Sequence, residues 1–246
     1  MECVVINLDS KPARWLRVHA ALNAIGMKHR RFAAIDGRTI GATYDHLLWP
    51  GTRAITPYSV LGCALSHYLV VQEFVEGSND ICLVLEDDAI VAEGCKTNLK
   101  RILAEAPPGW DMIKLASSCP YDGPNVLKKQ TISVDLVALL ISRAGAGKIL
   151  QQRIAWPSFA DVTPWFIPNF NTYVVTKNLA TFYQTFTDSS INGTRYPGRR
   201  LNTKVIRFGA VEILLGDVLA LLVVALALVV RYAWKKVKRK RVLLRK

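Results

Sequence analysis

The most restrictive feature of this chain is a fully apolar run at residues 81–85, followed directly by three acids, Glu86-Asp87-Asp88. An uninterrupted apolar run of this length is typical of a central strand that is covered on both faces. In open α/β sheets, ligands bind beyond the carboxyl ends of the strands. The pattern therefore predicts an α/β fold in which three carboxylates stand at the ligand-binding edge of the sheet.

Strand-like and helix-like patterns alternate around this run. Short apolar, β-branched segments predict further strands at residues 3–8, 31–35, 111–115 and 134–141. Apolar residues at helical spacing predict helices at 12–25, 59–75, 94–105 and 143–154. This order predicts a mostly parallel sheet flanked by helices, and 246 residues suffice for one such domain but not for two.

The formal net charge of +13 belongs to the C-terminal part of the chain. Residues 1–194 contain 18 Lys and Arg and 17 Asp and Glu, so this region is nearly neutral. Five basic residues follow between 195 and 210, and nine more lie between 231 and 246 without an acid. A nearly neutral globular region without a recognised binding motif argues against nucleic acid as a partner.

Residues 211–234 combine an apolar run with aromatic residues. The uninterrupted part is 218–230, and Glu212 and Asp217 lie near one end. A spanning helix needs about 20 apolar residues, and an acid near the helix end costs less than the roughly 2.5–3.5 kcal/mol paid at its centre. Tyr232 and Trp234 precede a polybasic tail, as expected at a membrane interface. We predict a membrane-associated or transmembrane helix; a buried core helix with a solvated tail is the alternative.

These segments predict four regions along the chain. They are a globular domain at 1–194, a basic linker at 195–210, the membrane helix at 211–234 and a polybasic tail at 235–246. The N-terminus enters a strand at once and lacks the features of a secretory signal. The prediction is therefore a membrane protein whose globular domain lies on the cytoplasmic face.

The five cysteines are odd in number, and none of them forms a CxxC pair. This usage argues against a zinc site or a disulfide framework. Cys63 and Cys82 lie in apolar runs and are expected to be ordinary buried thiols. The pattern fits a reducing compartment.

The acidic triplet predicts a divalent-cation site. Side chains alternate along an extended chain, so Glu86 and Asp88 face one side and Asp87 the other. Adjacent carboxylates repel each other unless a cation lies between them, and oxygen ligands of this kind prefer Mg²⁺ or Mn²⁺ together with substrate phosphates. Such a cation makes a diphosphate a good leaving group. A solvated acidic turn is the alternative.

Four blocks of the sequence occur in an order that resembles glycosyltransferase family 25. They are an INL strand followed by Arg14, an AAIDG turn, a GCALSH helix start and the LVLEDD block. Looser similarity continues in the WDMIKL strand, a small-residue segment, an ADV segment and a C-terminal SSI block. The resemblance covers about residues 3–192 and leaves out the predicted membrane segment.

The resemblance implies a GT-A-like fold and a metal-dependent inverting transfer of a hexose, such as galactose, from a nucleotide-sugar, with UDP the expected nucleotide. It implies Mn²⁺ or Mg²⁺ as cofactor, held by Glu86 and Asp88. The implied acceptor is a lipopolysaccharide, lipooligosaccharide or other lipid-linked glycan. The candidates for binding the donor are Asn7, Arg14, Asp36, Gly37, Ser66, His67, Asp87 and Gln184.

Inversion requires a general base on the acceptor hydroxyl. Asp161 is the first candidate, because it lies in a segment rich in aromatic residues, and Asp188 is the second. Asp161 could equally cap a helix or bind ribose, and His67 could simply be a buried histidine hydrogen-bonded near Ser66. Arg14 could bind diphosphate or lie on a solvated helix face.

For the whole chain, the alternative to an enzyme is a non-catalytic membrane scaffold or anionic-surface-binding protein with a degenerate transferase fold.

Overall fold

The computed structural model describes residues 1–92, 94–116, 127–130, 136–154, 167–176, 179–182, 205–208 and 211–214. The chain forms two compact units, Met1–Pro197 and Gly198–Lys246. Asp161, Gln184 and Asp188 lie outside the described residues, as do residues 215–234 of the predicted membrane segment.

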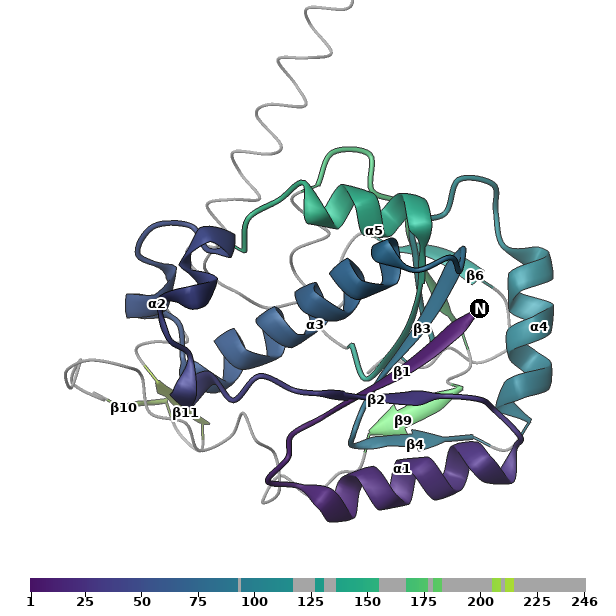
Figure 1. The fold of residues 1–246 in the computed structure, drawn as a ribbon, viewed down its shortest axis with the longest axis horizontal. Helices are drawn as coiled ribbons and strands as arrows, with labels where there is room; N and C mark the ends of the chain where they lie inside the picture. The colour runs from purple at the N-terminus through teal and green to yellow at the C-terminus, as the bar shows by residue number, and fades with distance from the viewer. Residues whose placement is uncertain are drawn as a thin grey trace, which may run out of the picture. The chain divides into compact units, whose positions relative to one another are not determined.

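The first unit contains a β-sheet with helices beside it (Figure 1). Its helical elements are α1 (Pro12–Ala24), η1 (Gly37–Thr39), η2 (Ala42–Leu47), α2 (Thr52–Ile55), α3 (Tyr58–Glu76), α4 (Cys95–Glu105) and α5 (Arg143–Leu150). Its strands are β1 (Glu2–Asn7), β2 (Arg30–Ala33), β3 (Ile81–Glu86), β4 (Ala89–Val91), β5 (Met112–Lys114), β6 (Leu127–Gln130), β7 (Ala138–Ser142), β8 (Thr172–Val175) and β9 (Ala180–Phe182). Within the described ranges, seven strands form one sheet in the order β2-β1-β3-β7-β5-β8-β6, and β4 pairs with β9.

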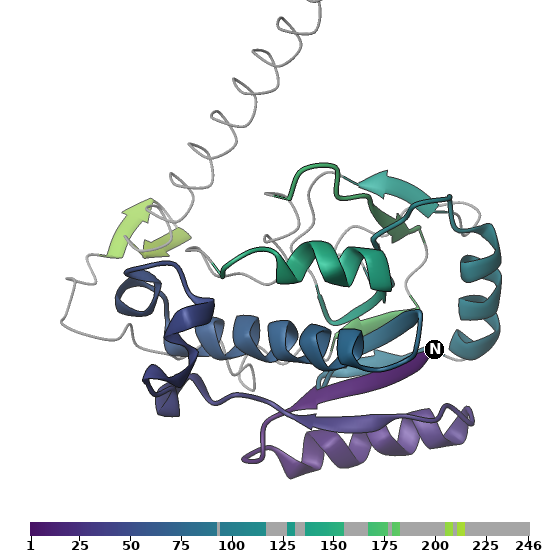
Figure 2. The ribbon, with the colours of Figure 1, turned by 45° about the horizontal axis from the view of Figure 1, so that its top comes forward.

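Helices cover both faces of the sheet, because successive strand residues point to opposite sides. One core cluster joins Val5, Leu83 and Leu85 to apolar residues of α1 and α4. The other joins Val4 and Val84 to apolar residues of α3 and α5. Figure 2 shows α3 and α5 on one side of the sheet and α1 on the other. Strand β3 lies between β1 and β7, so the prediction of a central, fully buried strand is confirmed.

The prediction of a mostly parallel sheet is wrong in part, because the sheet is mixed. Strand β1 runs parallel to β2 and β3, whereas β7 runs antiparallel to both β3 and β5. Parallel neighbours need a long crossover, usually a helix. Between β5 and β7 the described part of the chain contains only strand β6, so β7 can enter the sheet from the opposite end. The mixed sheet flanked by helices remains an α/β fold.

The second unit contains two described strands, β10 (Val205–Phe208) and β11 (Val211–Leu214), which pair antiparallel. The first four residues of the predicted membrane helix, 211–214, thus form a strand instead of a helix. Among the described residues, no helix has the length and apolar character that crossing a membrane requires.

Candidate functional site

The sequence blocks of interest meet at the carboxyl ends of two parallel neighbours, β1 and β3. The register pairs Ile6 with Glu86, so Asn7 ends β1 beside the acidic triplet. The buried apolar stretches of both strands hold these ends in the middle of the sheet. Residues far apart in the sequence are therefore presented together at the edge where α/β sheets bind ligands.

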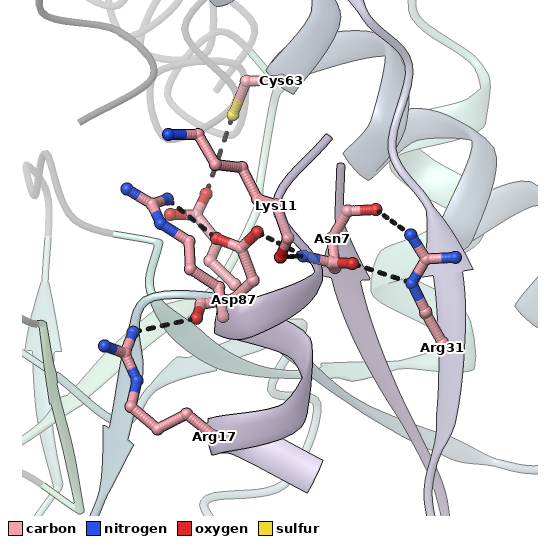
Figure 3. Close-up of polar contacts among 8 residues, drawn as sticks. Asn7, Lys11, Arg17, Arg31, Cys63 and Asp87 are labelled. Atoms are coloured by element: carbon pink, nitrogen blue, oxygen red, sulfur yellow. Dashed lines mark hydrogen bonds and ion pairs between the residues drawn. The ribbon is translucent and has the colours of Figure 1, made fainter. Parts of the chain in front are cut away.

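Asp87 is the centre of a buried polar network (Figure 3). Its Oδ2 accepts a hydrogen bond from Asn7 Nδ2 at 2.7 Å, and its Oδ1 accepts one from Arg14 Nη1 at 3.0 Å. The Arg14 and Asp87 side chains form a buried ion pair, with 10% and 11% of their surface exposed. Arg17 Nη2 donates to the Asp87 carbonyl oxygen at 3.3 Å. These contacts give Asp87 a role in holding the end of β3 against α1.

Asn7 connects this network to the neighbouring strand β2. Arg31 Nε donates to Asn7 Oδ1 at 2.8 Å, and Arg31 Nη2 donates to the Asn7 carbonyl at 3.2 Å. Asn7 Nδ2 also donates to the Lys11 carbonyl at 3.0 Å. Asn7 is 1% exposed, and its amide thus uses both its oxygen and its nitrogen inside the protein.

Glu86 points to the opposite side, toward α3. His67 Nε2 lies 3.0 Å from Glu86 Oε1, and Cys63 Sγ donates to the same oxygen at 3.7 Å. Cys63 and His67 are four residues apart on α3, so their side chains lie on one helix face. Burial acts to raise the pKa of Glu86, but the hydrogen bond and charge of His67 outweigh it and leave this pKa below its ordinary value.

The AAIDG turn is packed tightly against the start of α3. A Cβ atom on Gly37 would lie 1.6 Å from the Tyr58 carbonyl oxygen, and one on Gly62 would lie 2.5 Å from the Ile35 carbonyl oxygen. Ser66 Oγ accepts a hydrogen bond from the Ile35 amide at 2.8 Å. Only glycine permits these approaches, which explains why the turn and the helix start both carry one.

Two of the predicted donor-binding residues have structural contacts in this turn. Ser66 Oγ also donates to the Gly62 carbonyl at 2.6 Å. The Asp36 carboxylate accepts from the Arg38 backbone amide at 3.0 Å and caps η1. The side-chain hydrogen bond from Arg38 lowers the pKa of Asp36 below its ordinary value. Asp36 and Ser66 therefore shape the turn, and Asp36 keeps a partly exposed carboxylate.

The Asp88 side chain has a carboxylate oxygen, Oδ1, that is buried but accepts no hydrogen bond among the described residues. Burial, together with the negative charges of Glu86 and Asp87, raises the pKa of Asp88 to about 7. A buried carboxylate oxygen without a donor is costly unless a cation occupies its lone pairs. Asp88 together with the partly exposed Glu86 therefore fits a divalent cation with oxygen ligands.

The structure brings together most of the predicted site residues that it describes. Asn7, Arg14 and Asp87 form one network, and His67 contacts Glu86. His67 is 8% exposed, as expected for a buried histidine, but its partner is Glu86 and not Ser66. Arg14 lies buried against Asp87, so the solvated-face alternative is wrong.

Sequence reasoning missed Cys63, Arg17 and Arg31. Cys63 was expected to be an ordinary buried thiol, whereas it is half-buried and contacts Glu86. Its four-residue spacing from His67 was the signal that could have found it. Arg17 and Arg31 carry no such signal, because their partners come from distant parts of the chain.

The acidic triplet and the converging blocks lie at the ligand-binding edge of a mixed α/β sheet. The family model described as "Glycosyltransferase family 25 (LPS biosynthesis protein)" matches residues 1–126, just over half of the chain. This protein belongs to glycosyltransferase family 25.

Three similar proteins match between 108 and 170 residues of this chain. A "Glycosyltransferase 25 family member" of Aedes aegypti is 27% identical over 169 residues, which cover 61% of this chain and 28% of the relative. A "Probable inactive glycosyltransferase 25 family member 3" of Rattus norvegicus is 29% identical over 170 residues, covering 61% and 29%. A "Putative glycosyltransferase R655" of Acanthamoeba polyphaga mimivirus is 32% identical over 108 residues, covering 41% and 32%. The matched region thus spans less than a third of each relative's length.

One solved structure is similar in outline. It is a glycosyltransferase involved in the glycosylation of the major capsid of PBCV-1, and it matches with a TM-score of 0.44 and 10% identity over 70% of this chain and 79% of that chain. A likeness of this size supports no argument about the site, so the GT-A-like assignment stays a prediction.

Proposed function

We propose that this protein transfers a hexose from a nucleotide-sugar to a glycan acceptor. The observation that carries the proposal is the convergence of the family's separate sequence blocks at the ends of β1 and β3. Family membership supports the reaction class. The expected donor is a UDP-hexose, with galactose as the first sugar to test.

In this proposal, Glu86 and Asp88 hold Mn²⁺ or Mg²⁺ against the donor diphosphate. The support is the buried, unpartnered Asp88 Oδ1 beside a second carboxylate. The cation would neutralise the charge that develops on the leaving diphosphate. Asp87 is bonded to Asn7 and Arg14, so its part is to fix the acidic turn.

The general base of the inverting reaction is proposed among the acids of the C-terminal half. Asp161 remains the first candidate and Asp188 the second, and Gln184 remains a candidate for binding the donor sugar. The base must accept the proton of the acceptor hydroxyl on the side opposite the leaving diphosphate.

The proposed acceptor is a lipopolysaccharide, lipooligosaccharide or other lipid-linked glycan on the cytoplasmic membrane face. The family description names lipopolysaccharide biosynthesis, and the apolar run and basic tail at the C-terminus suit a membrane surface. A membrane-bound enzyme meets a lipid-anchored acceptor at a raised local concentration.

The test is a donor-hydrolysis and transfer screen with purified full-length protein. UDP-hexoses are supplied with Mn²⁺, and nucleotide release is compared between the wild type and Asp88→Asn. We expect the variant to lose roughly 100-fold or more, because it removes a proposed ligand that acts on the developing charge. The matched control is Glu105→Gln, an exposed acid at the end of α4 that pairs with Arg101.

A degenerate transferase serving as a scaffold is the second candidate, because some of the related proteins are named inactive. It predicts no donor turnover by wild type with any UDP-hexose and divalent cation. Turnover that depends on Asp88 would exclude the scaffold; turnover that is equal in Asp88→Asn would overturn the assigned role of the acid.

A further inference from the structure

The donor atoms of Cys63, His67 and Glu86 lie closer together than ordinary packing requires. Their Sγ, imidazole nitrogen and carboxylate oxygen are all within 4.8 Å of one another. The His67–Glu86 and Cys63–Glu86 separations are 3.0 Å and 3.7 Å. Around a tetrahedral Zn²⁺, neighbouring ligand atoms stand about 3.3–3.6 Å apart, as follows from bond lengths of about 2.0–2.3 Å. The two separations that involve Glu86 are close to this spacing, and the Cys63–His67 separation, at most 4.8 Å, must shorten toward it for the three atoms to share one ion.

We propose that Cys63, His67 and Glu86 form a binding site for a borderline transition-metal ion, with Zn²⁺ as the ion that fits best. A thiolate and an imidazole select Zn²⁺ or Co²⁺ over Mg²⁺, which prefers oxygen ligands. The site is thus chemically distinct from a carboxylate site for Mn²⁺ or Mg²⁺. Three protein ligands leave a fourth position open to water.

The local structure favours metal capture. Cys63 and His67 sit one turn apart on α3, and the tight packing of Gly62 against Ile35 fixes that turn. Glu86 closes the triangle from the end of β3, which the core holds rigidly. The Glu86 side chain is 30% exposed, so an ion can reach the ligands from solvent.

Binding replaces two hydrogen bonds with metal bonds. The Cys63 thiol releases its proton to solvent, and His67 ligates through Nε2 as a neutral imidazole with its hydrogen on Nδ1, any proton on Nε2 having left to solvent. Glu86 supplies a carboxylate that is already ionised. The charge of the three ligands then becomes −2, which matches the dication.

The site has a consequence for activity that rests on the proposed function. Because Glu86 belongs to both sites, Zn²⁺ at Cys63 and His67 withdraws this carboxylate from Mn²⁺ and the donor. Zn²⁺ should therefore inhibit Mn²⁺-dependent turnover. The inhibition should weaken when Cys63 is replaced by Ser, judged as the ratio of rates with and without Zn²⁺ within each variant.

The direct test uses Co²⁺ as a spectroscopic substitute for Zn²⁺ on the reduced full-length protein, without donor. Wild type should show a thiolate-to-cobalt charge-transfer band in the near ultraviolet that disappears in Cys63→Ser. His67→Gln should weaken binding by roughly 10-fold or more, since losing even an outer-shell partner costs about 10–100-fold. Cys119→Ser, the thiol control, should keep the band. A wild type without the band, or a band that survives in Cys63→Ser, overturns the proposal.

X-ray absorption of the Zn²⁺-loaded wild type identifies the ligand atoms around the ion without any substitution, so its result does not depend on whether a variant folds. One sulfur at about 2.3 Å with nitrogen and oxygen at about 2.0–2.2 Å supports the site. A shell with no sulfur, or with several, overturns it.

Asp88→Asn separates the two proposals: it should retain the cobalt–thiolate band while losing donor turnover. A band without any turnover in wild type would leave the metal site standing and refute the transferase.

Discussion

Arg14 and Asp87 stand 73 positions apart in the chain and form an ion pair at 3.0 Å, with 10% and 11% of their side chains exposed. The pair joins the first turns of α1 to the acidic turn after β3. Because Asn7 donates to the other carboxylate oxygen of Asp87, this turn is held from two elements at once. The position of Glu86 therefore depends on a neighbour whose side chain faces the other side of the sheet.

Replacing Asp87 with Asn should lower the free energy of unfolding by about 3 kcal/mol. The substitution removes the carboxylate that faces the buried Arg14 guanidinium, and breaking one side of a buried pair costs about 3–5 kcal/mol. Urea unfolding followed by circular dichroism measures the loss. The exposed Arg101–Glu105 pair on α4 is the control: Glu105→Gln should cost only about 0.3–0.5 kcal/mol. Equal small losses would show that the buried pair is not a structural clamp.

Gly37→Ala should destabilise the protein by about 1–3 kcal/mol, because the new methyl group would meet the Tyr58 carbonyl at 1.6 Å. The backbone on both sides must shift, and the turn would lose its packing on α3. Gly147, in helix α5, has nothing within 4 Å of an added Cβ. Gly147→Ala should therefore stabilise by about 0.5–1 kcal/mol. Thermal unfolding of both variants checks the contrast, and a neutral Gly37→Ala would contradict the observed approach.

The pH dependence of stability should carry the signature of Asp88. Burial first, and then the charges of Glu86 and Asp87, raise its native pKa to about 7 from its ordinary value of 3.8. The native state therefore binds more protons than the unfolded state between about pH 4 and 7, and stability falls as pH rises through this window. The slope reaches at most about 1.4 kcal/mol per pH unit.

Asp88→Asn removes this ionisation and should flatten the decline. Unfolding in EDTA between pH 5 and 8 gives the two slopes, and their difference reports Asp88 together with its effect on the neighbouring Glu86. The variant should be more stable than wild type at pH 8, even though we expect it to be inactive. Parallel slopes would mean that Asp88 ionises normally.

The buried thiols should resist alkylation in the native protein. Burial raises the pKa of Cys3 and Cys82 to about 12 and that of Cys95 to about 11. At pH 8 only about one thiol in 10,000 is then ionised at Cys3, and the thiolate is the reactive form. Peptide mapping after iodoacetamide treatment should find these three unmodified until urea is added. The half-buried Cys63 should react sooner, and equal modification of all four would contradict the burial pattern.

Several features were predictable because they depend on local sequence. The apolar run at 81–85 predicted a buried strand, and β3 is the central strand that it predicted. Alternation of side chains predicted that Glu86 and Asp87 face opposite ways, and they contact α3 and α1 on the two faces of the sheet. The family blocks predicted which segments converge.

Other features required the tertiary structure. The direction of β7 depends on how a connection without a described helix returns to the sheet, and no periodicity encodes this. The contacts of Arg17 and Arg31 join positions 70 and 24 residues apart. The cluster of Cys63 and His67 with Glu86 needed both the helical spacing and the placement of α3 over the end of β3.

The sequence by itself determined the acidic edge, the family and the main elements, namely strands β1, β2, β3, β5 and β7 and helices α1, α3, α4 and α5. Hydrophobic periodicity and short motifs act over a few neighbouring residues. Only the tertiary structure decided how the three acids differ. Asp87 is neutralised by Arg14, Glu86 meets a thiol and an imidazole, and Asp88 has a buried oxygen with no donor among the described residues. The physical reason is that a carboxylate's properties depend on the charges and donors within a few ångströms, and folding brings those from distant segments.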